Sequence, residues 1–360
     1  AIPDPIISIF FDMKDLIKTI VYFLGLITNM NNQIIKAEFI LEKFQFENNF
    51  SVPSVKNLNA ESVVNIYEAM RSFFPIYHNS EKETILAPRL ENILESFDGL
   101  FLDAFGVLNV GPKLIPGIIK TIDKARDMGI TLLVVTNGAS NDTSKKRDQL
   151  SSLGLEFSYD EIISSRDAAE VFLSFNKPEG PLGVLGNIGN KFTIPDLECV
   201  ELEQDYSIFE EMSSFILLGT TMWDTMWQDM LLNSLKDNPR PLFVANPDIV
   251  APHENKFSME PAYFISHLIA NGAHLPFWLG KPFPTIVELA LNRMTELAGR
   301  HLNLSRIGMV GDTLHTDILG SNSIGLKSVL MTNHGLFRNE NIAKMIKKTG
   351  IIPDFIIEGP

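Results

Sequence analysis

From Gly99 onward the chain alternates between short apolar runs and segments of helical length. The runs include GLFLDAFG, ITLLVVTNG, SSFILLG, RPLFVANPD, RIGMVGD and KSVLMTN, and most of them end in Gly, Asn or Asp. Strand–helix alternation of this kind is typical of a parallel sheet with helices on both faces. Such sheets bind their ligands beyond the carboxyl ends of the strands. The acidic and hydroxyl residues that follow the runs are therefore predicted to share one site.

The residues at these strand ends are those that phosphoryl transfer needs. Asp103 follows GLFL, Thr136 ends TLLVVT, Lys281 follows FWLG, and Asp312 and Asp317 form a G-D-x-x-x-x-D pattern after RIGMV. A carboxylate can attack phosphorus, while a cation, a hydroxyl and backbone N–H groups stabilise the charge that develops. A pair of carboxylates also suits Mg²⁺, which prefers hard oxygen ligands. Each residue alone has an ordinary structural explanation, but their order favours one phosphoryl-transfer site.

Composition and charge narrow the class of protein. With 360 residues, 45% of them hydrophobic and 21% charged, we expect two or three globular domains. The net charge of −14 disfavours a nucleic-acid partner, and the short basic run SKKR (144–147) is interpreted as a solvated helix face. The single cysteine, Cys199, excludes an internal disulfide and suits a reducing compartment. We therefore expect a cytoplasmic protein.

The first 95 residues have a different pattern. Residues 5–77 are expected to be mainly helical, with Asn59 as the N-cap of one helix, and the polar stretch 78–89 is expected to be a linker. The apolar segment 16–30 contains Lys18 and is shorter than the roughly 20 residues of a membrane span. We therefore expect a buried helix there, with a membrane-facing helix as the alternative, and no transmembrane segment.

The strand-end motifs, in this order, resemble the haloacid dehalogenase superfamily and, within it, the NagD-like, nitrophenylphosphatase-type branch. The matching stretches run from about Glu91 onward and are DAFGVL, GPKLIPG, VTNGAS, IISSRDAAE, VANPD, GKPFP and GDTLHTDILGS. The resemblance implies a Rossmann-like parallel-sheet core with an inserted α/β cap, and Mg²⁺-dependent hydrolysis of a small phosphorylated metabolite. We expect the core at 91–177 and 273–360, the cap at 178–272 and a helical N-terminal extension at 1–90.

The resemblance also implies which residues hold the metal ion. Asp103 corresponds to the nucleophile and to a ligand of Mg²⁺. The backbone carbonyl of Phe105 and the carboxylate of Asp312 correspond to further ligands. Asp317 corresponds to a residue that binds the ion directly or through a neighbouring group.

A second set of residues is implied to bind the phosphoryl group. Thr136, the backbone of Asn137 and Gly138 correspond to the phosphate-binding turn. Lys281 corresponds to the cation that neutralises the nucleophile and the phosphate. Asp248, at a predicted strand end of the cap, is either a substrate contact or a turn residue.

One position departs from the family pattern. The family carries an aspartate two residues after the nucleophile, which protonates the leaving group and then activates water, whereas this chain has Phe105. General acid–base catalysis contributes typically 10²–10⁴-fold, so alkyl phosphates should react more slowly than aryl or acyl phosphates. A phosphatase with altered acid–base provision is the favoured interpretation. The alternatives are a phosphate-binding sensor or scaffold with little turnover, and phosphonate cleavage or dehalogenation at Asp103.

Three further features have more than one interpretation. His315, inside the metal motif, is expected on the surface or behind the ligands, and the alternative is a substitute for the missing acid. The GNIGN stretch (186–190) is expected to be an ordinary loop rather than a phosphate-binding turn. Trp223 and Trp227, four residues apart, are expected in the core of the cap or in a homodimer contact through the cap.

Overall fold

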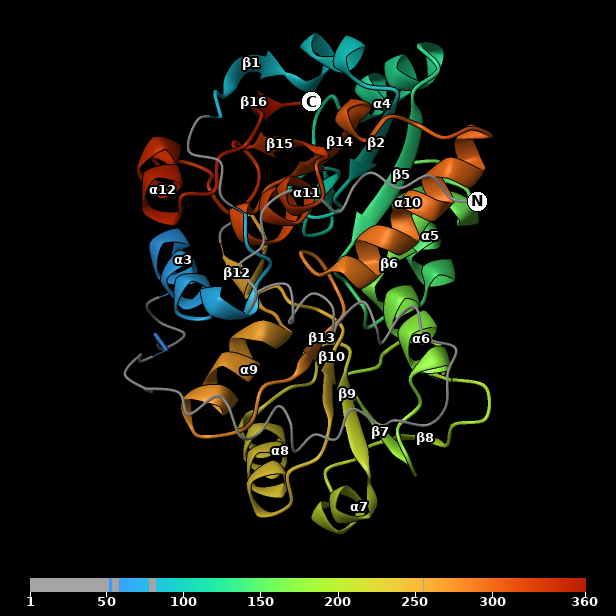
Figure 1. Cartoon of the computed structure of the whole chain (residues 1–360), viewed down its shortest axis with the longest axis vertical. Helices are drawn as coiled ribbons and strands as arrows, with labels where there is room; N and C mark the ends of the chain where they lie inside the picture. The colour runs from blue at the N-terminus through green and yellow to red at the C-terminus, as the bar shows by residue number, and fades with distance from the viewer. Residues whose placement is uncertain (1–51, 54–57, 78–81, 255) are drawn as a thin grey trace, which may run out of the picture.

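The larger sheet of the computed structural model has seven parallel strands in the order β1-β16-β15-β14-β2-β5-β6 (Figure 1). The structure describes residues 52–53, 58–77, 82–254 and 256–360. The strands are β1 (Ile85–Arg89), β2 (Gly99–Leu102), β5 (Thr131–Thr136), β6 (Ile162–Ser164), β14 (Ile307–Gly311), β15 (Lys327–Met331) and β16 (Phe355–Gly359). From the central pair β2 and β14 the chain continues toward opposite edges of the sheet. This pair is therefore the point at which the strand order reverses, where such sheets bind ligands.

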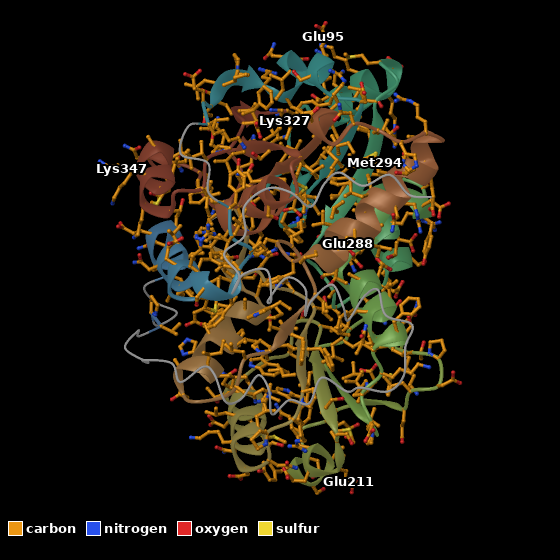
Figure 2. The ribbon with its side chains drawn as sticks, viewed as in Figure 1. Glu95, Glu211, Glu288, Met294, Lys327 and Lys347 are labelled. Atoms are coloured by element: carbon orange, nitrogen blue, oxygen red, sulfur yellow. The ribbon has the colours of Figure 1, made fainter. Side chains whose placement is uncertain are left out.

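Successive side chains of β2 point to opposite faces of this sheet, as the strand geometry requires. Leu100 and Leu102 share an apolar cluster with α4 (Ile118–Asp127), whereas Phe101 packs with Met294 of α10 (Pro284–Ala298), labelled in Figure 2. The other helices of this part are α5 (Thr143–Ser152), α6 (Ser165–Phe175), α11 (Leu319–Ser323), α12 (Ile342–Thr349) and the short turns η3 (Leu90–Asn92), η4 (Leu94–Ser96), η5 (Tyr159–Glu161) and η6 (Leu304–Arg306). The predicted Rossmann-like core is confirmed.

A second parallel sheet, of five strands in the order β13-β10-β9-β7-β8, lies below the first in Figure 1. Its strands are β7 (Leu182–Leu185), β8 (Cys199–Glu201), β9 (Ser214–Leu217), β10 (Leu242–Val244) and β13 (Phe277–Trp278). Helices α7 (Tyr206–Glu211), α8 (Thr225–Asp237) and α9 (Pro261–Ala270) accompany it. Glu95 beside the larger sheet and Glu211 beside the smaller one lie at opposite ends of the long axis (Figure 2). β13 lies beyond residue 272, the predicted end of the cap, and the domain boundaries themselves stay predictions.

Two short antiparallel hairpins complete the sheets. They are β3–β4 (Asn109–Val110 and Lys113–Leu114) and β11–β12 (Val250–Pro252 and Phe257–Met259). The second hairpin lies within residues 178–272, the predicted cap, which is called the insert below, and it contributes residues to the cavity described below.

The N-terminal part agrees only partly with expectation. Asn59 is the N-cap of α3 (Ala60–Ala69), as predicted, and its side-chain oxygen accepts a hydrogen bond from Ser62 N at 2.9 Å. The turn η2 (Arg71–Phe73) follows. Residues 85–89, expected in a linker, instead form β1, the edge strand that pairs with β16. Pro88 has no N–H to donate, which a strand at the edge of a sheet tolerates.

The segment 16–30, expected to be a buried helix, lies outside the described residues. Among the residues that are described, no helix has both the length and the apolar character needed to cross a membrane.

Candidate active site

The strand-end residues meet around a cavity of about 910 Å³ between the two sheets. Asp103 directly follows β2, Thr136 ends β5 and Asp312 directly follows β14, and all three line the cavity. The insert contributes Asp248 and Glu260 to the same cavity. The prediction that these motifs share one site agrees with this geometry, because parallel strands end at one edge of their sheet.

Lys281 joins two of the predicted carboxylates. Its Nζ donates hydrogen bonds to Asp103 Oδ1 and Asp317 Oδ1, each at 2.7 Å, and the lysine side chain is only 4% exposed. Burial disfavours the charged amine, but these carboxylates outweigh it and raise the pKa of Lys281 above its ordinary value. The lysine is therefore a fixed ammonium between these two carboxylates.

The carboxylate of Asp312 is held by its surroundings. It accepts hydrogen bonds from the Thr313 hydroxyl and the Leu336 amide, both at 2.8 Å. Gly106 has φ of +81°, and a Cβ on it would lie 2.5 Å from Asp312 Oδ2, so only glycine fits this approach. Asp317 lies on the following π-helical turn η7 (Leu314–Ile318), a helix type that is often found at functional sites.

These three carboxylates fit a divalent cation. Oxygen atoms of Asp103, Asp312 and Asp317 all lie within 4.8 Å of one another, and hard oxygen ligands are those that Mg²⁺ prefers. Burial raises the pKa of Asp103 to about 6 against the pull of Lys281. Burial together with the neighbouring carboxylates raises the pKa of Asp312 to about 8. The single ammonium of Lys281 cannot balance these three carboxylates, and a cation would neutralise the remaining negative charge.

Asn137 connects the core site to the insert. Its side-chain Nδ2 donates to Asp248 Oδ1 at 2.9 Å and to the Lys281 carbonyl at 3.1 Å, while its Oδ1 accepts from Lys281 N at 2.7 Å. Burial raises the pKa of Asp248 well above its usual range. In the neighbouring turn the Gly138 amide donates to Thr136 Oγ1 at 3.2 Å. Asp248 thus lines the cavity and is bound to Asn137, and its role as a substrate contact stays a prediction.

A chain of polar side chains runs from His253, near Phe105, along the β11–β12 hairpin to the start of α9. Phe105 lines the cavity, and the centroid of its ring lies 6.3 Å from that of His253. His253 Nε2 is 3.2 Å from Ser258 Oγ, which donates to Glu260 Oε1 at 2.8 Å. Burial raises the pKa of Glu260 to about 7. Sequence reasoning missed Ser258 and Glu260, because neither belongs to a motif and only the fold brings them to the cavity.

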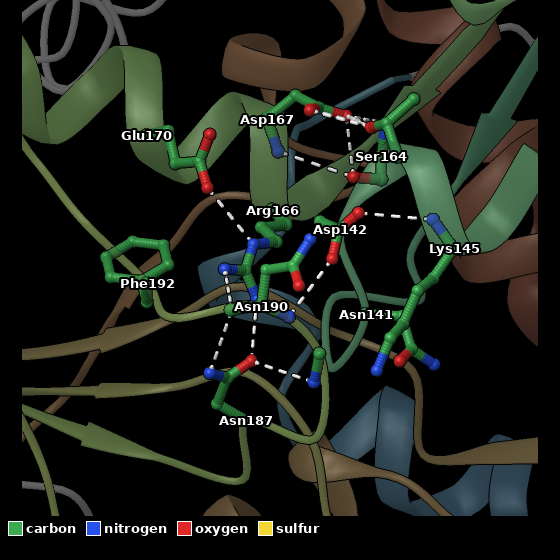
Figure 3. A network of polar contacts seen from close by, with 12 residues as sticks. Asn141, Asp142, Lys145, Ser164, Arg166, Asp167, Glu170, Asn187, Asn190 and Phe192 are labelled. Atoms are coloured by element: carbon green, nitrogen blue, oxygen red, sulfur yellow. Dashed lines mark hydrogen bonds and ion pairs between the residues drawn. The ribbon is translucent and has the colours of Figure 1, made fainter.

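Hydrogen bonds connect the GNIGN loop (186–190) to the core, as Figure 3 shows. Arg166 of α6 donates to Asn187 Oδ1 at 2.7 Å and to the Asn190 carbonyl at 2.8 Å. The Asn190 amide donates to Asp142 Oδ2 at 3.1 Å, and the amides of residues 188 and 189 donate to the Ser140 carbonyl. These amides already have partners within the protein, which favours the ordinary loop over a phosphate-binding turn.

Three other expectations are refined by the structure. Lys146, in the basic run expected to face solvent, is 8% exposed and lines the cavity; its amine bonds to the Asn141 carbonyl. His315 is fully buried, and its Nε2 lies 2.6 Å from Glu68 Oε1. The histidine therefore lies behind the predicted metal ligands. Trp223 lines the cavity and stacks on Trp227 with ring centroids 6.0 Å apart; the homodimer contact stays a prediction.

Comparison with known proteins gives a consistent answer. Residues 100–195 match the family described as haloacid dehalogenase-like hydrolase, and residues 278–358 match a HAD-hydrolase-like family. An acid sugar phosphatase of Staphylococcus haemolyticus is 22% identical over 237 residues, which cover 66% of this chain and 85% of that protein.

Solved structures show the same fold. A possible sugar phosphatase from Cytophaga hutchinsonii superposes with a TM-score of 0.67 at 27% identity, covering 77% of this chain and 98% of that one. NagD from E. coli K-12 superposes with a TM-score of 0.53 at 21% identity, covering 73% of this chain and 96% of NagD. Two haloacid dehalogenase-like families thus match separate parts of the chain, and its relatives include sugar phosphatases, so the chain is identified as a phosphatase of this type, similar in fold to NagD.

Proposed function

We propose that the chain is a Mg²⁺-dependent phosphohydrolase that forms an aspartyl-phosphate at Asp103. Its substrate would be a small phosphorylated metabolite, either a sugar phosphate or an aryl or acyl phosphate. The observation that carries the proposal is the ammonium of Lys281, which lies 2.7 Å from Asp317 and 2.7 Å from Asp103, a residue that lines the cavity. The sugar phosphatases among the similar proteins support the substrate class.

The metal ion has a set of ligands in this proposal. Asp103, Asp312 and Asp317 would hold it, with the backbone carbonyl of Phe105 as the further ligand that the family pattern implies. When bound, Mg²⁺ would polarise the phosphoryl oxygens and neutralise part of their charge.

The side chains and the backbone of the protein would carry out the bond-making and bond-breaking steps. Because Asp103 Oδ1 accepts a hydrogen bond from Lys281, Oδ2 would be the oxygen that attacks phosphorus. As that bond forms, the bond from phosphorus to the leaving oxygen breaks, while Lys281 and the turn 136–138 stabilise the phosphoryl oxygens. Water then attacks the aspartyl-phosphate, which releases inorganic phosphate and restores Asp103. Phe105 supplies no proton to the leaving oxygen, so a stable leaving group is favoured.

Phosphate release tests this proposal directly. We would measure it from acetyl phosphate, para-nitrophenyl phosphate and a hexose phosphate, with Mg²⁺ or with EDTA, in wild type and Asp103→Asn. We expect turnover with Mg²⁺ that is lost with EDTA and in Asp103→Asn. The hexose phosphate should react slowest, because its alkoxide leaving group needs a proton.

One other function is favoured by a specific observation. Phe105 removes the usual acid, which would suit a phosphate-binding protein with little turnover. Absence of release from all three substrates, together with measurable binding of Mg²⁺ and phosphate, would refute the hydrolase proposal and support this alternative.

A further inference from the structure

Helix α3 lies across the junction between core and insert, outside the residues that the families match. In Figure 1 it lies between α12 of the core and α9 of the insert. Lys344 of α12 forms an ion pair with Glu61 of α3 at 3.1 Å. The apolar side chains of α3 share one buried cluster with Ile265 of α9 and Leu314 of η7. α3 therefore contacts both parts of the molecule that enclose the cavity.

Two consecutive residues of α3 contact two loops of the site. The hydroxyl of Tyr67 accepts a hydrogen bond at 3.0 Å from the backbone N–H of Ile249, the residue that follows Asp248. The ring of Tyr67 stacks on His315 with centroids 4.6 Å apart and planes 8° apart. Glu68 Oε1 lies 2.6 Å from Nε2 of the same histidine. One helix thus fixes the 246–249 loop of the insert and the 312–317 loop of the core.

These contacts close a ring that runs through the catalytic groups. Asp248 accepts from Asn137 at 2.9 Å, and Asn137 accepts from the Lys281 amide at 2.7 Å. The ammonium of Lys281 donates to Asp317 at 2.7 Å. Asp317 lies on η7, the turn whose histidine stacks on Tyr67. Tyr67 is therefore in contact with both ends of the path that positions the lysine.

We propose that Tyr67 is a positioning residue for the reaction, which holds the 246–249 and 312–317 loops together so that Asn137 presents Lys281 to Asp103. The reaction in this statement rests on the proposed function, whereas the contacts do not. Ile249 is fully buried, and its N–H would lack a partner without the phenol oxygen. A buried donor without a partner is costly, so the loop is expected to shift.

The test needs a variant that removes one atom and a control that loses a tyrosine hydrogen bond elsewhere in the same cluster. Tyr67→Phe removes the oxygen and keeps the ring on His315. Tyr263→Phe is the matched control, because the Tyr263 hydroxyl donates to the Pro53 carbonyl at 2.9 Å. Tyr263 belongs to the same buried cluster and is 3% exposed, and its hydroxyl bonds to Pro53 rather than to the 246–249 or 312–317 loop.

Three quantities would be measured in the full chain: kcat/KM on acetyl phosphate, the affinity for inorganic phosphate in Mg²⁺ by calorimetry, and the thermal unfolding midpoint. We expect kcat/KM of Tyr67→Phe to fall roughly tenfold, because small misplacements of catalytic groups are costly. Its phosphate affinity should fall severalfold. Tyr263→Phe should stay within about twofold of wild type in both quantities, and its midpoint should fall less than that of Tyr67→Phe, because its hydrogen bond is only partly buried.

Two results would overturn this assignment: Tyr67→Phe matching wild type in both kcat/KM and phosphate affinity, or Tyr263→Phe losing as much as Tyr67→Phe. A wild-type protein without turnover would refute the hydrolase proposal alone, because phosphate affinity still tests Tyr67. A wild-type protein that neither turns over substrate nor binds phosphate would overturn both.

Discussion

At the scale of single residues, position 105 decides which leaving groups the site can expel. Phe105 lines the cavity two residues after Asp103, with its ring against that of His253. A phenyl ring can neither give nor take a proton, so the side chain takes no part in proton transfer. The leaving oxygen must then be stable without a proton or obtain one from elsewhere. The stability of the leaving oxygen, more than the affinity for the phosphoryl group, is expected to set the rate.

Restoring the carboxyl group should change that dependence. In Phe105→Asp we expect the ratio of the hexose phosphate rate to the acetyl phosphate rate to rise by about 10². Phe105→Asn is the control, because it makes the same loss of apolar packing without adding an acid. Steady-state rates on both substrates give the ratio. Equal ratios in the Asp and Asn variants would show that the missing acid is not what limits alkyl phosphates.

Glu260 predicts a dependence of stability on pH. Burial raises the pKa of Glu260 from 4.5 to about 7 in the folded protein. Between these values the folded state keeps the proton that the unfolded state loses, so Glu260 makes stability fall as pH rises. The contribution is fully present below pH 4.5 and lost by about pH 7.

We would measure it as the free energy of unfolding by urea at pH 4.5 and pH 7.5. Wild type should lose roughly 3 kcal/mol more over this range than Glu260→Gln. Glu179→Gln, the same change at an exposed residue, should behave as wild type. Parallel pH dependence in wild type and Glu260→Gln would contradict the assignment.

At the scale of elements, the loop 186–190 is expected to depend on Arg166. This arginine is 2% exposed, bonds to two residues of the loop and pairs with Glu170 at 3.0 Å. In Arg166→Lys a single ammonium replaces a planar group with several donors. We expect the amides of Ile188 and Gly189 to exchange hydrogen faster, and the free energy of unfolding to fall by roughly 2–3 kcal/mol.

Hydrogen exchange followed by mass spectrometry measures this loop directly. Arg147→Lys is the control, because the Arg147 side chain is 46% exposed. Unchanged exchange at residues 188–189 in Arg166→Lys would show that other contacts hold the loop.

The elements that carry the motifs could be predicted because their signals are local. An apolar run followed by Asp103, Thr136 or Asp312 identifies both a strand and its carboxyl end. β1 could not be identified in this way, because its polar flank and Pro88 favour a linker. Its pairing with β16 joins residues that are far apart in the sequence, and such pairing leaves no periodic signal.

At the scale of the whole molecule, the site depends on contacts between parts that no local pattern connects. Asn137 of the core binds Asp248 of the insert, and Tyr67 of α3 binds the residue after it. The sequence predicted Asn137 in a phosphate-binding turn and left Asp248 as either a substrate contact or a turn residue. It could not predict the Tyr67 contact, because α3 lies outside the family resemblance and its packing depends on the assembled core and insert.

The most direct test of the central claim is to identify the phosphorylated residue. Radiolabelled acetyl phosphate would be mixed with the protein and Mg²⁺, quenched in acid within the first turnover and digested. We predict label on the peptide that contains Asp103, sensitive to hydroxylamine as an acyl phosphate is, and absent in EDTA and in Asp103→Asn. Release of phosphate without label at Asp103, or with label at another residue, would contradict the account.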